Sequence, residues 1–304
     1  MSGTVLQPRK AMPMTQIITV LSEVSDRYQA LFVDLWGCVH DGVRALPDAV
    51  AALQAYRAKG GIVVLVTNSP KPRAGIEGQL KVFGVPEDAW DTIASSGDSA
   101  RSAMLRGAVG KNVWFMGEEE RDAAFFEPLS VIDNPVTISR VPLEQAQGIV
   151  CCGPFDPMAD PEVNRPQFLY AKQKGLKLLC ANPDIVVDRG ETREWCAGAL
   201  ARLYAEMGGE SLYFGKPHPP IYDLARRRLM ELGHDMPSEA ILAIGDGIQT
   251  DIAGAMGEDI DSLFITGGLA AAETKTTRQP DPEALSTYIA KENQSPTFSI
   301  GQLR

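Results

Sequence analysis

The chain has 304 residues, of which 44% are hydrophobic and 22% are charged, a composition typical of globular proteins with one large or two medium domains. Its formal net charge of −10 argues against polyanionic partners, so we expect neither nucleic acid nor an anionic membrane surface to bind. No stretch reaches the roughly 20 apolar residues that cross a bilayer, and the N-terminus lacks a signal-like apolar core, so we expect a cytoplasmic protein.

The apolar pattern predicts a short helix followed by alternating strands and helices. Residues 15–24 have the spacing of an amphipathic helix. The runs predicted as strands are 30–34, 62–66, 241–244 and 262–265. The helical patterns are 48–59, 72–83, 220–232 and 251–257, and glycines at 60, 84 and 233 would end three of them. This alternation is typical of a parallel sheet covered on both faces.

The middle of the chain repeats the pattern on a smaller scale. Its predicted strands are 113–116, 148–151 and 176–180, and its helical patterns are 97–107, 118–126 and 163–174. The proline-rich stretch 154–166 is predicted as a loop, and the tail after residue 275 is weakly patterned. We expect a main α/β domain formed by residues 1–95 and 208–304, with a smaller α/β domain, residues 96–207, inserted as a cap.

The five cysteines have no metal-ligand spacing, and in a cytoplasmic protein they are expected to be reduced and buried. They are Cys38, Cys151, Cys152, Cys180 and Cys196. The adjacent pair lies in a predicted strand, which favours a place in the core over a redox switch.

Polar residues follow four of the apolar runs, where an open α/β sheet binds its ligands. They are Asp34 after 31–33, Thr67 and Asn68 after 62–66, Lys216 in the segment 214–217, and Asp246 with Asp251 after 241–244. Each has an ordinary alternative, because Asp residues also cap turns and helices, and Lys is common on surfaces. Their joint order favours a catalytic site.

Four segments, taken in their order along the chain, resemble motifs of the haloacid dehalogenase superfamily. They are Asp34-Leu35-Trp36-Gly37, Val66-Thr67-Asn68-Ser69, Gly215-Lys216-Pro217 and Gly245-Asp246-Gly247. The resemblance covers about residues 28–270 and is strongest to its class IIA, NagD-like phosphatases, which include pyridoxal phosphate and phosphoglycolate phosphatases. It implies a doubly wound, Rossmann-like parallel sheet with an inserted α/β cap. It also implies hydrolysis of a small phosphorylated metabolite, a Mg²⁺ cofactor and a homodimer formed through the cap.

The resemblance assigns roles in phosphoryl transfer to three of these segments. Asp34 would be the nucleophile that forms an aspartyl-phosphate. Thr67 and Asn68 would bind the phosphoryl oxygens through a hydroxyl and a backbone N–H. Lys216 would bind the phosphate and offset the charge of both the phosphate and the carboxylate.

The implied Mg²⁺ site is made of oxygen ligands, as this cation prefers. Asp34, the backbone carbonyl of Trp36 and Asp246 would be the direct ligands. Asp251 would act through a water molecule.

Two segments resemble those of the class IIA cap. Residues 95–99 look like the entry to the cap, and Ala181-Asn182-Pro183-Asp184 looks like its signature. The resemblance implies that Asn182, Asp184 and Arg189 face the substrate, with Arg189 able to bind a carboxylate or a second phosphate. An ordinary turn with a solvated Arg is the alternative.

Trp36 departs from the family pattern, because nearly all such phosphatases have a second Asp two residues after the nucleophile. That Asp protonates the leaving group and then activates the hydrolytic water, and an indole can do neither. General acid–base assistance contributes roughly 10²–10⁴ in rate. His40 and Asp41 are the candidates to replace it, with a polar flap turn as the alternative. Ser69 also stands where a second Asn is usual.

Three functions therefore remain open. The first is a slow or atypical Mg²⁺-dependent phosphatase. The second is a catalytically quiet protein that binds phosphate or a metabolite. The third, a metal-free dehalogenase, would explain an aromatic residue after the nucleophile, but it has no use for Asp246 and Asp251, and its cap is inserted earlier in the chain.

Overall fold

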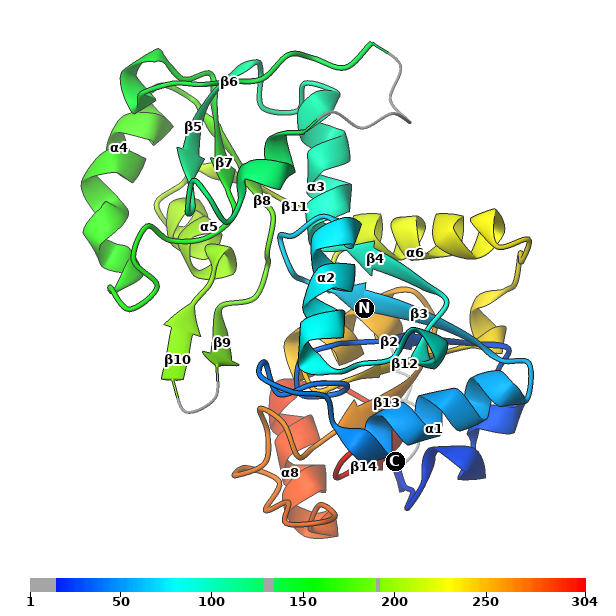
Figure 1. Cartoon of the computed structure of the whole chain (residues 1–304). Helices are drawn as coiled ribbons and strands as arrows, with labels where there is room; N and C mark the ends of the chain where they lie inside the picture. Colours follow the sequence, from blue (N-terminus) through cyan, green and yellow to red (C-terminus); the bar gives the residue numbers. More distant parts are fainter. Residues whose placement is uncertain (1–14, 128–133, 190–191) are drawn as a thin grey trace, which may run out of the picture.

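The structure is a computed structural model that describes residues 15–127, 134–189 and 192–304. Its largest element is a seven-stranded sheet in the order β1-β14-β13-β12-β2-β3-β4, in which every neighbouring pair is parallel (Figure 1). The strands are β1 (Gln16–Ile17), β2 (Ala30–Val33), β3 (Ile62–Thr67), β4 (Thr92–Ser95), β12 (Ile241–Gly245), β13 (Asp261–Ile265) and β14 (Phe298–Ile300). This confirms the parallel sheet predicted from the alternating apolar runs and the doubly wound arrangement that the resemblance implies.

Helices cover both faces of this sheet because side chains on a strand alternate between faces. Leu31 and Val33 of β2 pack in one core cluster with α1 and α2, whereas Phe32 packs with α6 and α7 in another. A further cluster joins α8 to Phe264 of β13. The helices are α1 (Pro47–Ala58), α2 (Arg73–Phe83), α6 (Pro219–Glu231), α7 (Ala253–Gly257) and α8 (Pro282–Glu292).

The smaller unit has its own five-stranded parallel sheet, in the order β11-β8-β7-β5-β6. The strands are β5 (Asn112–Met116), β6 (Ser139–Arg140), β7 (Gly148–Cys151), β8 (Lys177–Cys180) and β11 (Glu210–Tyr213). One face packs against α4 (Arg165–Gln173) and α5 (Ala197–Glu206), and the other against α3 (Ser96–Leu105). An antiparallel hairpin of β9 (Val186–Arg189) and β10 (Thr192–Trp195) projects from this unit, the cap, toward the main sheet (Figure 1).

Two predicted helices are wrong. Within residues 15–24, Gln16–Ile17 form the edge strand β1, which pairs with β14, and a short 3-10 helix follows at Leu21–Glu23. Pairing with a strand from the other end of the chain thus prevails over the local helical spacing. The pattern at 118–126 yields only a 3-10 helix at Ala123–Phe126, which places Phe125 in the cap core.

The strand pairing also bears on the predicted end of the cap at residue 207. β11 pairs with β8 of the cap sheet, whereas the sequence pattern predicts that residues 208–304 belong to the main domain. We therefore propose a boundary after Tyr213.

The cysteines are free and buried, as expected. Within the described part of the chain, no helix has the length and apolar character needed to span a membrane.

The entry to the cap depends on a close backbone contact at Gly97. Its N–H donates to the Ser69 carbonyl at 3.0 Å. A Cβ atom at this position would lie 2.2 Å from the carbonyl oxygen of Pro70. The start of α3 is therefore held against the loop that follows β3.

We expect Gly97→Ala to destabilise the protein by about 1–3 kcal/mol, because the new methyl group would displace backbone. Gly78→Ala is the control, since Gly78 lies in α2 with nothing within 4 Å of an added Cβ. That variant should gain about 0.4–1 kcal/mol. Urea unfolding would compare the two, and equal stabilities would contradict the contact.

Candidate active site

The carboxyl ends of β2, β3 and β12 bring the predicted site residues together. These strands are neighbours in the sheet. The chain runs from β2 to β3 on one side and from β12 to β13 on the other, and open α/β sheets bind ligands at such a reversal of strand order. Asp34 follows β2, Thr67 ends β3 and Asp246 follows β12. All three side chains are buried.

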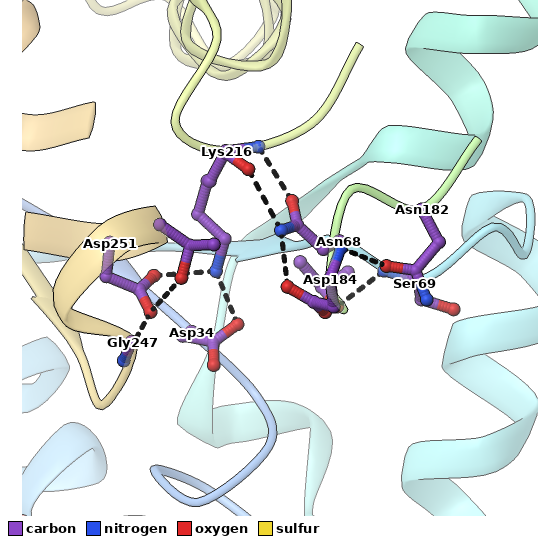
Figure 2. A network of polar contacts seen from close by, with 10 residues as sticks. Asp34, Asn68, Ser69, Asn182, Asp184, Lys216, Gly247 and Asp251 are labelled. Carbon is purple, nitrogen blue, oxygen red and sulfur yellow. Dashed lines mark hydrogen bonds and ion pairs between the residues drawn. The ribbon is translucent and has the colours of Figure 1, made fainter. Parts of the chain in front are cut away.

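Lys216 connects two carboxylates at this edge (Figure 2). Its Nζ donates to Oδ1 of Asp34 at 2.5 Å and to Oδ1 of Asp251 at 2.7 Å, and the residue is only 3% exposed. Burial alone would lower the pKa of Lys216, but the charges of Asp251 and Asp34 outweigh it and raise that pKa well above its ordinary value. The ammonium therefore stays charged between the two acids.

The cluster holds more buried acids than Lys216 can balance. Burial and the charges of Asp34 and Asp251 raise the pKa of Asp246 well above its ordinary value. Burial raises the pKa of Asp34 against the opposing effect of Lys216, and it raises that of Asp251 to about 6. Such an excess of buried carboxyl groups favours an added cation.

The donor set fits a hard divalent cation. Ligand atoms of Asp34, Cys38 and Asp246 lie within 4.8 Å of one another. Burial raises the pKa of the Cys38 thiol well above its usual value, which keeps this thiol protonated and leaves the two carboxylates as the donors. Added Cβ atoms at Gly37 and Gly268 would lie 2.3 and 2.0 Å from Oδ2 of Asp246, so backbone encloses this carboxylate.

Asp251 has contacts that the sequence did not reveal. Besides its ion pair with Lys216, its Oδ2 accepts from the Gly247 N–H at 3.0 Å. The carboxylate therefore orients Lys216 and closes the turn after β12. Its role toward a metal through water stays a prediction.

Asn68 links the main domain to the cap (Figure 2). Its Nδ2 donates to Oδ1 of Asp184 at 2.8 Å and to the Lys216 carbonyl at 3.1 Å, and its Oδ1 accepts from the Lys216 N–H at 2.7 Å. The side chain is thus fully engaged, and its backbone N–H remains the group predicted to meet phosphate. The hydroxyl of Thr67 accepts from the Ser69 N–H at 3.2 Å.

The cap residues Asn182 and Asp184 line the same cavity as Asp34. Oδ1 of Asn182 accepts from the Asp184 N–H at 3.0 Å, which shapes the turn. Burial raises the pKa of Asp184 more than the hydrogen bond from Asn68 lowers it. Arg189 ends β9, but its side chain lies outside the described residues, so its contact with substrate stays a prediction.

His40 and Asp41 have local contacts in the turn after Asp34. Nδ1 of His40 accepts from the Gly42 N–H at 3.1 Å, and the ring lies edge-on to Trp36 and Phe83. Burial lowers the pKa of His40 to about 4, so its ring is neutral at physiological pH. Oδ1 of Asp41 accepts from the backbone N–H groups of Val43 and Arg44. The bond from Arg44 holds the pKa of Asp41 below its ordinary value. Both side chains line the cavity, and their role as substitute acid or base stays a prediction.

The cavity between the main domain and the cap has a volume of about 630 Å³. Beyond the predicted residues, it is lined by groups that sequence analysis missed, among them Arg121, Asp122, Val187 and Trp195. These residues follow no local motif. Only the folding of the cap over the sheet edge brings them to the site.

Comparisons with known proteins agree with this geometry. Residues 31–127 match the family described as haloacid dehalogenase-like hydrolase, and residues 213–291 match the one described as HAD-hydrolase-like. A crystal structure of a hydrolase of the haloacid dehalogenase-like family from Brucella suis is 37% identical, covers 95% of this chain and 100% of its own, and has a TM-score of 0.82. The chain belongs to the haloacid dehalogenase-like hydrolase family.

Curated relatives of this hydrolase family are more distant in sequence. The acid sugar phosphatase of Staphylococcus saprophyticus is 22% identical over 87% of this chain and 95% of its own length. The ribonucleotide monophosphatase NagD of Escherichia coli is 24% identical over 77% and 86%, respectively. The family predicted from the motifs, with its class IIA resemblance, is thereby confirmed.

We predict that the stability of the protein depends on pH, because His40 is buried in its neutral form. Because burial lowers its pKa from 6.5 to about 4, the unfolded chain binds the proton more readily. This contribution is complete above pH 6.5 and is lost as the pH falls toward 4, by about 3 kcal/mol in all. His40→Gln should flatten this part of the profile, relative to the unchanged protein, in urea unfolding between pH 4 and 7. An unchanged profile in His40→Gln would contradict the assignment.

Proposed function

We propose that the protein is a Mg²⁺-dependent phosphatase acting on a small phosphorylated metabolite through an aspartyl-phosphate on Asp34. One observation carries this proposal: Lys216 is buried at the carboxyl edge of the sheet between Asp34 and Asp251, with Asp246 beside them. A structural ion pair would need one acid for one base. The surplus of acids fits a site that also takes a cation and a phosphate.

The residues would divide the chemistry as follows. An oxygen of Asp34 attacks phosphorus as the bond from phosphorus to the leaving-group oxygen breaks. Lys216 offsets the charge that gathers between the carboxylate and the phosphoryl group, and Thr67 with the Asn68 backbone N–H binds the phosphoryl oxygens. Mg²⁺, held by Asp34, Asp246 and the Trp36 carbonyl, would supply further charge neutralisation.

Trp36 makes the two half-reactions unequal. A leaving group that is already a weak base departs without a general acid, so Asp34 can be phosphorylated. Hydrolysis of the aspartyl-phosphate needs an activated water, and the indole is no base. We therefore propose slow turnover, limited by the second step.

The names of the relatives support a small substrate. The acid sugar phosphatase and the ribonucleotide monophosphatase both act, by name, on phosphorylated small molecules. A cavity of about 630 Å³ lies within the range of small-molecule sites.

A catalytically quiet binding protein is the second candidate, and Trp36 is the observation that favours it. The pocket would then hold a phosphorylated ligand without turning it over. A panel of phosphate esters, tested with and without Mg²⁺, discriminates the phosphatase from the binding protein. Absence of turnover together with tight binding of a phosphorylated ligand supports the binding protein.

We expect Mg²⁺ to bind the protein, and we expect Asp246→Asn to weaken this binding at least tenfold, because an amide oxygen carries no charge. Asp41→Asn is the matched control, since it removes a carboxylate from the same cavity while keeping the oxygen that caps its turn. Isothermal titration calorimetry measures both. Equal affinity in the Asp246 variant and the unchanged protein would remove the metal site from the proposal.

With Mg²⁺ and excess p-nitrophenyl phosphate, we expect a stoichiometric burst of nitrophenol followed by slow turnover. An acid quench should trap a phosphoryl adduct on the peptide that contains Asp34. Both should vanish in Asp34→Asn, because an amide is no nucleophile.

The fate of the adduct tests the role given to Trp36. Trp36→Asp should shorten the life of the adduct and raise steady-state turnover, by up to roughly 10²-fold. Fast turnover of the unchanged protein with neither burst nor adduct would mean that another group already serves as the base.

A further inference from the structure

The side chain of Trp36 joins the main domain to the cap. Its indole N–H donates to the backbone carbonyl of Asp188 in β9 at 2.7 Å, across 152 positions of the chain. A carboxylate at position 36 could not form this bond, because it is an acceptor facing another acceptor. The substitution that removes the expected acid therefore supplies a donor toward the cap.

The main domain holds the indole in place from two sides. The ring of His40 lies edge-on to it, with ring centroids 5.4 Å apart. Gly42 lies against its other edge, where an added Cβ would be 2.3 Å from Cζ2 of Trp36. Gly42 also has a φ of +84°, a conformation that glycine adopts without strain. The turn after Asp34 is thus shaped around this side chain.

On the cap side, the bond reaches a hairpin that forms a wall of the active-site cavity. β9 and β10 pair from Val186–Trp195 to Arg189–Thr192. Val187, Asp188 and Trp195 line the same cavity as Asp34. The position of this hairpin therefore determines the space next to the nucleophile.

Asp184 provides a second tie at the base of the hairpin. It receives the hydrogen bond from Asn68, two residues before β9 begins. Asp188 lies further along the strand. The hydrogen bonds at Asp184 and at Asp188 therefore hold β9 in position at two points along the chain.

We propose that Trp36 is a positioning residue that holds the hairpin β9–β10 closed over the active-site cavity and thereby limits the size of the leaving group. The tie itself does not depend on catalysis. The selection of the leaving group rests on the proposed phosphatase function.

Hydrogen–deuterium exchange of the intact protein tests the tie. Trp36→Phe keeps a ring but removes the donor, so the backbone amides of β9 and β10 should exchange about three- to tenfold faster, as loss of one hydrogen bond allows. Trp90→Phe is the matched control. The Trp90 indole nitrogen is buried without a hydrogen-bond partner among the described residues, so this variant removes an indole and no bond.

Gly42→Ala is a second variant that keeps the donor and displaces the ring. It should also speed exchange of the hairpin, with the strands β5, β7 and β8 unchanged. Unchanged hairpin exchange in Trp36→Phe, or equal acceleration in every strand of the protein, would overturn the proposal.

A substrate comparison separates this inference from the proposed function. Naphthyl phosphate has a larger leaving group than p-nitrophenyl phosphate. In Trp36→Phe, the ratio of kcat/KM for naphthyl phosphate to that for p-nitrophenyl phosphate should therefore rise about threefold or more. The ratio should stay constant in Trp90→Phe. A constant ratio in Trp36→Phe would overturn the limit on leaving-group size. If the unchanged protein has no phosphatase activity but the hairpin exchange responds as expected, the proposed function fails and the tie stands.

Discussion

The ion pairs of Lys216 with Asp34 and Asp251 are the constraint around which the site is built. A buried ammonium is costly unless it is paired, and each carboxylate here is costly unless the ammonium is present. The three side chains come from separate segments, so the pairs hold those segments in one arrangement. Asn68 adds to this by bonding to both the N–H and the carbonyl of Lys216. The geometry expected to receive a phosphate is therefore fixed before any ligand arrives.

The same network couples the active site to the cap. Asn68 contacts Asp184, and the indole of Trp36 contacts the backbone of β9, so two cap contacts start from the loops that follow β3 and β2. The buried acids favour an added cation, and we propose that the hairpin restricts what can approach the site. The charge of the active site and the access to it thus depend on residues that line one cavity, because this cavity lies between the main domain and the cap.

Trp36 shows how one position can change two properties at once. The resemblance implies an acid at this position, and acid–base assistance would be lost with it. In exchange, the indole donates a hydrogen bond that a carboxylate cannot make. His40 is packed against the indole and is neutral, and Asp41 caps its own turn, so both have structural contacts besides the substitute acid–base role predicted from the sequence.

The sequence by itself determined the parallel sheet, the inserted cap and the residues at the strand ends, because apolar runs and strand-end motifs are local patterns. It could not give the edge strand β1, whose partner β14 lies at the far end of the chain and prevails over a local helical spacing. Nor could it give the pairing of Asp251 with Lys216 or the bond from Trp36 to Asp188. These contacts join distant segments, so their geometry exists only in the folded chain, and the bond from Trp36 to Asp188 forms only once the cap lies over the sheet.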